Sequence, residues 1–419
     1  MTDTNAIGRR AALGLALVSG TTGVARRARA QAGTAPPQEV KIAMLVPLSG
    51  PWARSGILEK LGAEMAIDDI NAAGGIRSLG GAKLRLMQFD TQDSAEKAKD
   101  AAQRMVAQEP DLVGGFGCWL SSFTLAATEV TERVGLPWLT LSYSDLITGR
   151  GFQNVFQTAP TADSQARQLL PTILDMAQNA TGKRPTKVAL LADNTAANVS
   201  FLREVREHTL KELGLTAVVD QMYTPPIADA TTLVQPIRSA RPDFCIMLSS
   251  NVPDDKLLLD KFAEFGLAGG RLPLIGGGGH IGAPELLKVT GADILQGLMA
   301  GLANWPGREQ DRLAESFVAR TKEPWFGHDS VFAYVHVLIF KEALERAGVA
   351  DRRKVSEAIR GLDMRDGPAL FFPGHHLKFD DKGRRVDAVL AMIQWQNGRP
   401  VAIYPQEIAA SSAIWPKVA

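Results

Sequence analysis

The sequence predicts an α/β protein built from two similar open parallel sheets, each covered by helices on both faces. Apolar runs of strand length alternate with segments of helical apolar spacing along the chain. The alternation begins at Lys41–Leu45 and restarts at Lys187–Leu191, which matches the first run in residue type at each position. With 419 residues, 45% of them hydrophobic, the chain is long enough for more than one domain.

The first series opens with the apolar run Lys41–Val46, which ends at Pro47 and is typical of a buried parallel strand. The helix Gly56–Ala73 follows and stops at Gly74-Gly75, because glycine readily ends helices. The other predicted strands are Leu84–Phe89, a strand that begins at Leu112, and Pro137–Leu141. The other predicted helices are Ala95–Glu109 and Ser122–Val134.

The second series repeats this order before the pattern changes near the C-terminus. Its predicted elements are strands Lys187–Leu191, Thr216–Met222, Phe244–Leu248, Leu272–Gly276 and Leu298–Ala303, and helices Asn198–Leu213, Thr232–Ala240 and Asp255–Phe265. The last part predicts helices Ser330–Ala347 and Lys354–Arg360, and strands Lys378–Phe379 and Val389–Trp395 joined through the turn-like Asp380–Gly383.

Charge and cysteine content exclude several classes of protein. The net charge is +1, whereas nucleic-acid binders carry a basic excess, so we expect no nucleic-acid partner. Cys118 and Cys245 are too few for a disulfide scaffold or a cysteine-rich metal site, and we expect both to be free, buried thiols.

Residues 1–30 are predicted to be a signal peptide and not part of the fold. Arg9-Arg10 precede the uncharged stretch Ala11–Ala25, and small residues precede a cleavage site near Ala30. The paired arginines resemble a twin-arginine signal, with an ordinary Sec signal as the alternative. No cysteine lies at the cleavage site, so we expect a soluble periplasmic protein without a lipid anchor. We expect this protein to be a monomer.

The two series divide the rest of the chain into two lobes. Lobe 1 is predicted to comprise residues 38–158 plus 304–367, and lobe 2 residues 159–303 plus 368–419. The chain is expected to cross between the lobes near Thr158–Thr161, Ala303–Trp305 and Asp366–Pro368, which predicts a hinge of three strands.

Ligands of open parallel sheets bind outside the carboxyl ends of the strands, so the loops that follow the strands are candidate sites. Their residues are mainly small and polar, with a few aromatic side chains between them. They include Ser121, Ser122, Ser142, Ser144, Asn194, Thr195, Ser249, Ser250 and Asn251, together with Trp52, Trp119 and Tyr143. Hydroxyls and aromatics with few charges predict recognition of a small organic ligand.

Signatures of enzymes and cofactors are incomplete. Gly277-x-Gly279-x-x-Gly282 follows a strand, but no acidic residue ends the next strand to contact a ribose. His375-His376 lies near Asp380-Asp381, yet adjacent strand residues point to opposite faces, which favours a solvated turn over a metal site. We therefore predict a protein that is not an enzyme, with no cofactor and no metal.

Two motifs resemble the opening of the Leu/Ile/Val-binding protein family. They are Pro47–Gly56 and Asp69–Ile76, and the resemblance extends from about Val40 to Tyr404. It implies the type I periplasmic solute-binding fold of hydrophobic amino acid and amide ABC importers. The implied partners are a small-molecule ligand and an ABC permease and ATPase complex in the inner membrane. A sensor of the same fold acting on a membrane receptor is the alternative function.

By this resemblance, Ser121 and Ser144 bind a ligand carboxylate, assisted by backbone groups of Ser142 and Tyr143. The predicted helix begins at Ser122, where free N–H groups favour an anion. The alternative is that Ser121 or Ser122 only caps the helix. Tyr334 stands where the family has an aromatic lining residue, although its helical spacing also suits the core.

Departures from the family bear on the ligand. Amino-acid binders of the family carry an acidic residue near the position of Gly278, and family tyrosines are replaced by Ala197 and Asn251. These changes favour an amide, a urea-like compound or a carboxylic acid over an α-amino acid, since an unpaired ammonium is costly. Gly117-Cys118-Trp119 resembles the urea- and amide-binding branch of the family.

Three charged side chains leave the nature of the ligand open. Arg54 is a candidate partner for a ligand carboxylate, or else a solvated arginine at the rim of the site. Asp145 or Asp254 is an alternative partner for a ligand ammonium.

Overall fold

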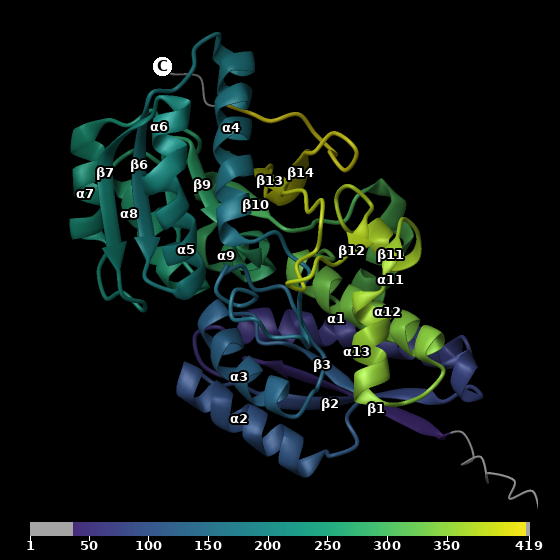
Figure 1. Cartoon of the computed structure of the whole chain (residues 1–419). Coiled ribbons are helices and arrows are strands. Elements are labelled where there is room, and N and C mark those ends of the chain that lie inside the picture. Colours follow the sequence, from purple (N-terminus) through teal and green to yellow (C-terminus); the bar gives the residue numbers. More distant parts are fainter. Residues whose placement is uncertain (1–36, 416–419) are drawn as a thin grey trace, which may run out of the picture. The chain divides into compact units, whose positions relative to one another are not determined.

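The computed structural model describes residues 37–415, and the signal peptide predicted for residues 1–30 lies outside them (Figure 1). The first sheet is entirely parallel, with the strand order β2-β1-β3-β4-β5. Its strands are β1 (Glu39–Val46), β2 (Lys83–Asp90), β3 (Gly114–Gly117), β4 (Trp138–Thr140) and β5 (Val155–Gln157). The order reverses between β1 and β3, so the loops after these two strands are favoured ligand positions.

Helices cover both faces of this first sheet. They are α1 (Ala53–Ala72), α2 (Ala95–Gln108), α3 (Ser121–Arg133), α11 (Asp311–Thr321), α12 (His328–Ala347) and α13 (Arg352–Arg360). Helix α1 packs on α12, and α2 packs on α3. The long apolar run of α12 is explained by this position, because it is buried between the sheet and α1.

The second sheet repeats the first and then extends it. Its order is β14-β13-β10-β9-β8-β6-β7, and the parallel part β7-β6-β8-β9-β10 has the topology of the first sheet. The parallel strands are β6 (Lys187–Asp193), β7 (Thr216–Tyr223), β8 (Phe244–Leu248), β9 (Leu274–Gly277) and β10 (Met299–Leu302). Two antiparallel strands, β13 (Ala391–Gln396) and β14 (Arg399–Tyr404), form one edge.

The helices of the second lobe bury both faces of its first strand, β6. They are α4 (Ala162–Thr181), α5 (Ala196–Glu204), α6 (Leu210–Leu213), α7 (Thr231–Ala240), α8 (Val252–Glu264), α9 (Pro284–Thr290) and α10 (Ala292–Leu295). Val188 and Leu190 of β6 pack with residues of α4 and α5, whereas Ala189 and Leu191 pack with residues of α7 and α8. This alternation explains the continuous apolar run, because both faces of β6 are covered.

The fold differs from the sequence prediction in several places. No element was predicted for the segment that forms α4, most of whose polar residues are partly or fully exposed while Ala166, Leu170 and Ile173 are buried. The strand predicted at Val389–Trp395 does not form a hairpin with Lys378–Phe379. Instead β12 (Leu377–Lys378) pairs with β11 (Asp363–Met364).

The segment after Asp366–Pro368, where the last crossing between the lobes is predicted, begins in contact with the first sheet. Ala369, Phe372 and Phe379 still pack in the core of the first lobe, because their apolar side chains cover its sheet and helix α12. The chain then turns at Asp380, whose Oδ1 accepts the N–H groups of Lys382 and Arg384.

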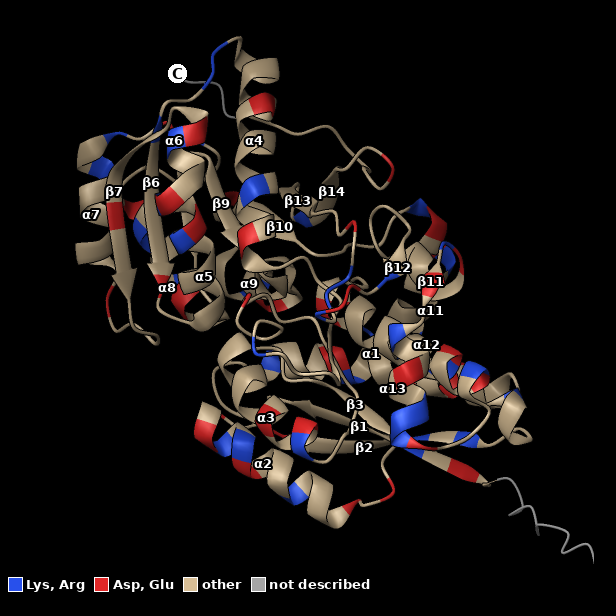
Figure 2. Ribbon diagram, in the orientation of Figure 1, with Lys and Arg blue, Asp and Glu red and all other residues tan. Residues whose placement is uncertain are grey.

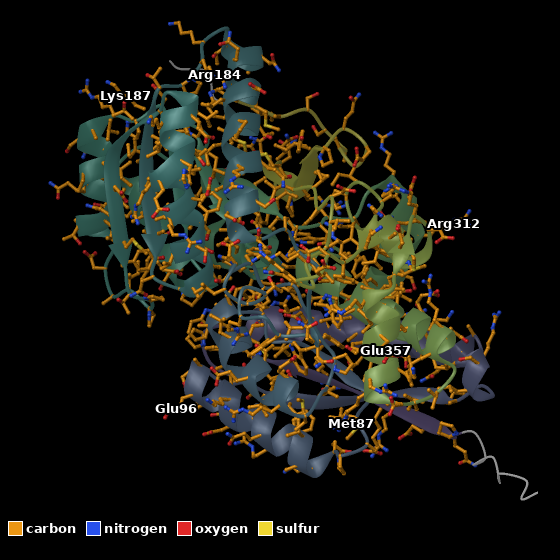
Figure 3. All side chains as sticks on the ribbon, viewed as in Figure 1. Met87, Glu96, Arg184, Lys187, Arg312 and Glu357 are labelled. Atoms are coloured by element: carbon orange, nitrogen blue, oxygen red, sulfur yellow. The ribbon has the colours of Figure 1, made fainter. Side chains whose placement is uncertain are left out.

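Charged residues are distributed over the exposed faces of the helices, with both signs intermixed on α2 (Figure 2). Arg184 and Lys187, labelled in Figure 3, lie at the amino end of β6, the end opposite the candidate ligand loops. Within residues 37–415, no helix has the length and apolar content needed to cross a membrane.

Candidate functional site

A cavity lies where the carboxyl ends of the two sheets face each other. Residues from both lobes line it, mostly apolar or hydroxyl-bearing side chains and glycines. They are Trp119, Leu120, Ser121, Leu141, Ser142, Tyr143, Ala162, Gln165, Leu169, Thr195, Ala197, Asn198, Phe201, Leu248, Ser249, Ser250, Gly277, Gly278, Gly279, His280, Gly301 and His328. An apolar cavity with a few convergent polar groups is the usual form of a small-molecule site.

Ser121 anchors the first-lobe wall of the cavity. Its Oγ accepts hydrogen bonds of 3.1 Å from the backbone N–H groups of both Tyr143 and Ser144. The Ser121 hydroxyl proton therefore remains available for a ligand acceptor, since its lone pairs are occupied. Ser142 is engaged differently, because its Oγ donates to the carbonyl of Trp119 at 2.8 Å.

Helix α3 begins beside this hydroxyl without a side-chain cap. The N-cap residue is Leu120, which excludes the alternative that Ser121 or Ser122 caps the helix. N–H groups in the first turn of a helix favour an anion. The preceding residue, Trp119, has a φ of 65°, a left-handed conformation that non-glycine residues adopt mainly at functional or strained positions.

A second polar chain in the first lobe runs from Tyr143 through His328. The hydroxyl of Tyr143 lies 3.0 Å from His328 Nε2, and His328 Nδ1 lies 3.2 Å from the carbonyl of Asn304. A carbonyl only accepts, so Nδ1 carries the imidazole proton and Nε2 accepts from Tyr143. Burial lowers the pKa of His328 to about 4, which keeps this ring neutral at pH 7.

Buried acids lie directly behind the cavity. Asp329, on α12, accepts a 3.0 Å hydrogen bond from Nε1 of Trp119. Burial raises the pKa of Asp329 to about 7, and burial together with Asp329 raises the pKa of Glu59 well above its usual value. The first-lobe wall therefore combines neutral donors with carboxyl groups that hold protons more strongly than usual.

The second-lobe wall comes from the loops after β6, β8 and β9. Asn198 donates from Nδ2 to Asp193 Oδ1 at 2.7 Å and to the carbonyl of Leu248 at 3.1 Å. Thr195 also donates to Asp193. Ser249, Ser250 and His280 complete this wall.

Eight of the residues predicted for the site line the cavity: Trp119, Ser121, Ser142, Tyr143, Thr195, Ser249, Ser250 and Gly278. Ser144 lies just behind it, where its Oγ is 2.9 Å from Ser200 Oγ of the second lobe. Ser122 does not line the cavity, because it is the second residue of α3 and the helix turns it away.

Five other predicted residues lie elsewhere. Trp52 packs edge-on against Phe123, and Asn194 is exposed and bonded to Thr224. Asn251 caps helix α8 through Asp254 N–H. The other two residues, Arg54 and Tyr334, bond to acidic side chains.

Arg54 forms two hydrogen bonds to the carboxylate of Glu323, at 2.9 and 2.6 Å. It is therefore a paired arginine and not a solvated one. Tyr334 donates to Asp69 at 3.2 Å in a separate groove that also includes Phe371. Both partners are remote in the sequence, which explains why the pairing was not predicted.

Several lining residues were not singled out from the sequence. Ala162, Gln165 and Leu169 belong to α4, which was not predicted at all. His328 precedes the predicted start of its helix at Ser330, and His280 lies within the pattern Gly277-x-Gly279-x-x-Gly282, which was considered only as a nucleotide signature. A histidine just after a strand was the signal that could have found His280.

The other predicted chemistries have clear outcomes. Cys118 and Cys245 are both buried and free, as expected. His376 is not in a solvated turn, because it is buried between Asp363 and Asp387, with its ring nitrogens 3.0 and 2.9 Å from their carboxylates. Residues 37–415 contain no group of three or more histidine, cysteine or acidic side chains that could hold a metal.

A family model described as periplasmic binding protein matches residues 39–400. The chain belongs to the periplasmic binding protein family. Leu/Ile/Val-binding protein homolog 7 of Brucella suis is 29% identical over 401 residues, which cover 92% of this chain and 96% of that relative. These matches confirm the family predicted from Pro47–Gly56 and Asp69–Ile76.

Solved structures with the same fold include two ligand complexes. The substrate-binding protein of a branched-chain amino acid transporter from Streptococcus pneumoniae, in complex with isoleucine, has a TM-score of 0.73 at 18% identity and covers 87% of this chain and 99% of its own. A solute-binding protein from R. palustris in complex with benzoate has a TM-score of 0.71 at 18% identity, covering 90% and 99%. The type I fold with two lobes is thereby confirmed. The family consists of solute-binding proteins, so this chain is a binding protein and not an enzyme.

Proposed function

We propose that the chain captures a small organic ligand with a carboxylate or carbonyl group between its lobes and delivers it to an ABC importer. The observation that carries this proposal is the cavity itself, which takes Ser121 and Tyr143 from one sheet and Asn198 and His280 from the other. A ligand that contacts both walls favours closure of the lobes, because it binds the closed form better.

The ligand is an amide, a urea-like compound, a carboxylic acid or an amino acid. The Ser121 hydroxyl and the first turn of α3 supply donors for its carboxylate or carbonyl end. Leu141, Leu169, Leu248 and Phe201 supply an apolar surface for its body. The relatives support this size and polarity, since isoleucine and benzoate are each a carboxylate on an apolar body.

The place and partners of the protein follow from the same proposal. We expect the chain to be exported to the periplasm as a soluble monomer without a lipid anchor. Its partners are a permease and an ATPase in the inner membrane. An adjacent gene for a receptor kinase in place of a permease would instead favour a sensor of the same fold.

A thermal-shift screen of the full chain against amino acids, amides, urea and aromatic acids tests ligand capture. A ligand that binds only the folded chain raises the melting temperature, because it stabilises the folded state. At a ligand concentration a hundred times Kd, the free energy of unfolding increases by about 2.7 kcal/mol. Small-angle scattering with a confirmed compound should show compaction. A screen without any stabilising compound, or unchanged dimensions on binding, would contradict the proposal.

A further inference from the structure

The second-lobe wall of the cavity contains two buried polar atoms that lack a hydrogen-bond partner within residues 37–415. They are Nδ1 of His280 and Oγ of Ser250, whose residues are only 2% and 6% exposed. Both residues line the cavity. Buried polar atoms are nearly always paired, so two unpaired atoms at one wall point to a ligand group there.

The other side of the His280 ring is held by Ser249. Nε2 of His280 lies 3.3 Å from Ser249 Oγ, and Ser249 donates its own proton to Asp255 Oδ1. Ser249 Oγ therefore accepts from Nε2–H, and a neutral imidazole protonated at Nε2 presents an acceptor lone pair at Nδ1. Burial lowers the pKa of His280 to about 3, so the ring is neutral at physiological pH.

Gly278 keeps this lone pair uncovered. A Cβ at residue 278 would lie 3.0 Å from Nδ1 and 2.9 Å from Cε1 of His280, and the φ of 94° also favours glycine. The lack of a side chain at residue 278 therefore leaves Nδ1 of His280 accessible from the cavity.

Three carboxyl groups lie behind this side of the cavity, and burial raises the pKa of Asp254 and raises that of Asp255 well above its usual value. Asp193, Asp254 and Asp255 are all fully buried at or beside the ends of β6 and β8. Neither lysine nor arginine occurs among the described residues that line the cavity. An unpaired acceptor atom at a wall without lysine or arginine favours a hydrogen-bond donor of the ligand.

We propose that His280, oriented by Asp255 and Ser249, accepts a hydrogen bond from an N–H group of the ligand. The site then selects carboxylates that also carry an amino, ammonium or amide donor, with the carboxylate at Ser121 and the donor at His280. This inference rests on the proposed ligand capture and names the ligand class. It gives an ammonium a partner other than Asp145 or Asp254, neither of which lines the cavity.

The test uses two pairs of compounds that differ only in the donor: L-leucine with 4-methylpentanoate, and 4-aminobenzoate with benzoate. Titration calorimetry of the full chain should show at least tenfold tighter binding of the donor-bearing member in a pair that binds. His280→Leu should reduce this ratio to below threefold. His280→Asn should restore part of it, because an amide oxygen can occupy the place of Nδ1.

His336→Leu is the matched control. His336 is equally buried, on α12, but it contacts Thr158 and does not line the cavity, so its replacement should leave the ratio unchanged. Equal affinity within each pair in the wild type, or an unchanged ratio in His280→Leu, would overturn the inference while leaving ligand capture in place. If His280→Leu does not fold, the ratio of affinities within each pair of compounds in the wild type is the test. Binding of none of the four compounds would overturn both the inference and the capture of this ligand class.

Discussion

Gly279→Ala should block closure of the lobes without unfolding either one. Gly279 follows β9 in the second lobe, and its nearest neighbours are His328 and Asp329 at the start of α12 in the first lobe. A Cβ at residue 279 would lie 2.7 Å from His328 Cδ2 and 2.7 Å from Asp329 Cγ, with Asp329 Oδ1 closer still. These neighbours cannot easily move, because Trp119, Tyr143 and Asn304 hold them through hydrogen bonds.

The magnitude follows from the cost of overpacking. One extra carbon in a packed site costs about 1–3 kcal/mol. The cost falls on the closed form alone, since opening the lobes separates Gly279 from α12. It therefore appears in binding, where it corresponds to a roughly 5- to 150-fold increase in Kd.

Calorimetry measures this increase with the compound that stabilises the wild type most in the thermal-shift screen. Small-angle scattering at saturating ligand should show less compaction than in the wild type. Gly361→Ala is the control, because Gly361 ends α13 with a φ of −84° and its Cβ would lie 3.4 Å from the nearest atom. A Kd for Gly279→Ala within threefold of the wild-type value would refute the reasoning.

Three further predictions concern single side chains. Ser121→Ala should raise Kd by roughly ten- to a hundredfold, since a hydrogen bond to a charged group contributes about 1.5–3 kcal/mol. Ser122→Ala is the control and should change Kd less than twofold. Equal effects of the two variants in calorimetry would contradict this prediction. Asp329→Asn should remove a pH dependence of the stability. The pKa of Asp329 is about 7 in the folded chain and 3.8 in the unfolded chain, so between pH 5 and 7 the folded wild type binds a proton that the unfolded chain releases. The free energy of unfolding of the wild type should therefore fall relative to the variant by about 1.4 kcal/mol per pH unit in this range, and parallel pH profiles of the two proteins in urea unfolding would exclude this. Arg54→Ala should leave Kd unchanged and cost about 1 kcal/mol or less, because Arg54 pairs with Glu323; a loss of affinity in calorimetry would return Arg54 to the site.

The repeat of apolar runs was sufficient to predict two similar sheets of mainly parallel strands, but not the antiparallel edge of the second sheet. Lys41–Leu45 and Lys187–Leu191 became β1 and β6, which hold equivalent positions in their sheets. Helix α4 was missed because its apolar residues are interrupted by Pro171 and by many polar residues. Its burial depends on strands far away in the sequence, which local periodicity does not reveal.

Part of the candidate site was predictable because position in a parallel sheet constrains it. Ser121 and Tyr143 follow β3 and β4, and strand ends of one sheet meet at one edge. Arg54 and Tyr334 were assigned by their positions in the chain alone. Their acidic partners, Glu323 and Asp69, are 269 and 265 residues away, so only the folded chain shows that they are engaged.

The sequence by itself determined the class of the protein, the family and several of the loops that line the cavity. These depend on short-range patterns: strand-length apolar runs, glycine stops and the motif Pro47–Gly56. The tertiary structure alone decided which atoms face the cavity. Whether Ser121 or His280 offers a proton or a lone pair depends on partners in other elements, Tyr143 for one and Ser249 for the other. Such hydrogen bonds are made across the fold, and for that reason no local pattern encodes them.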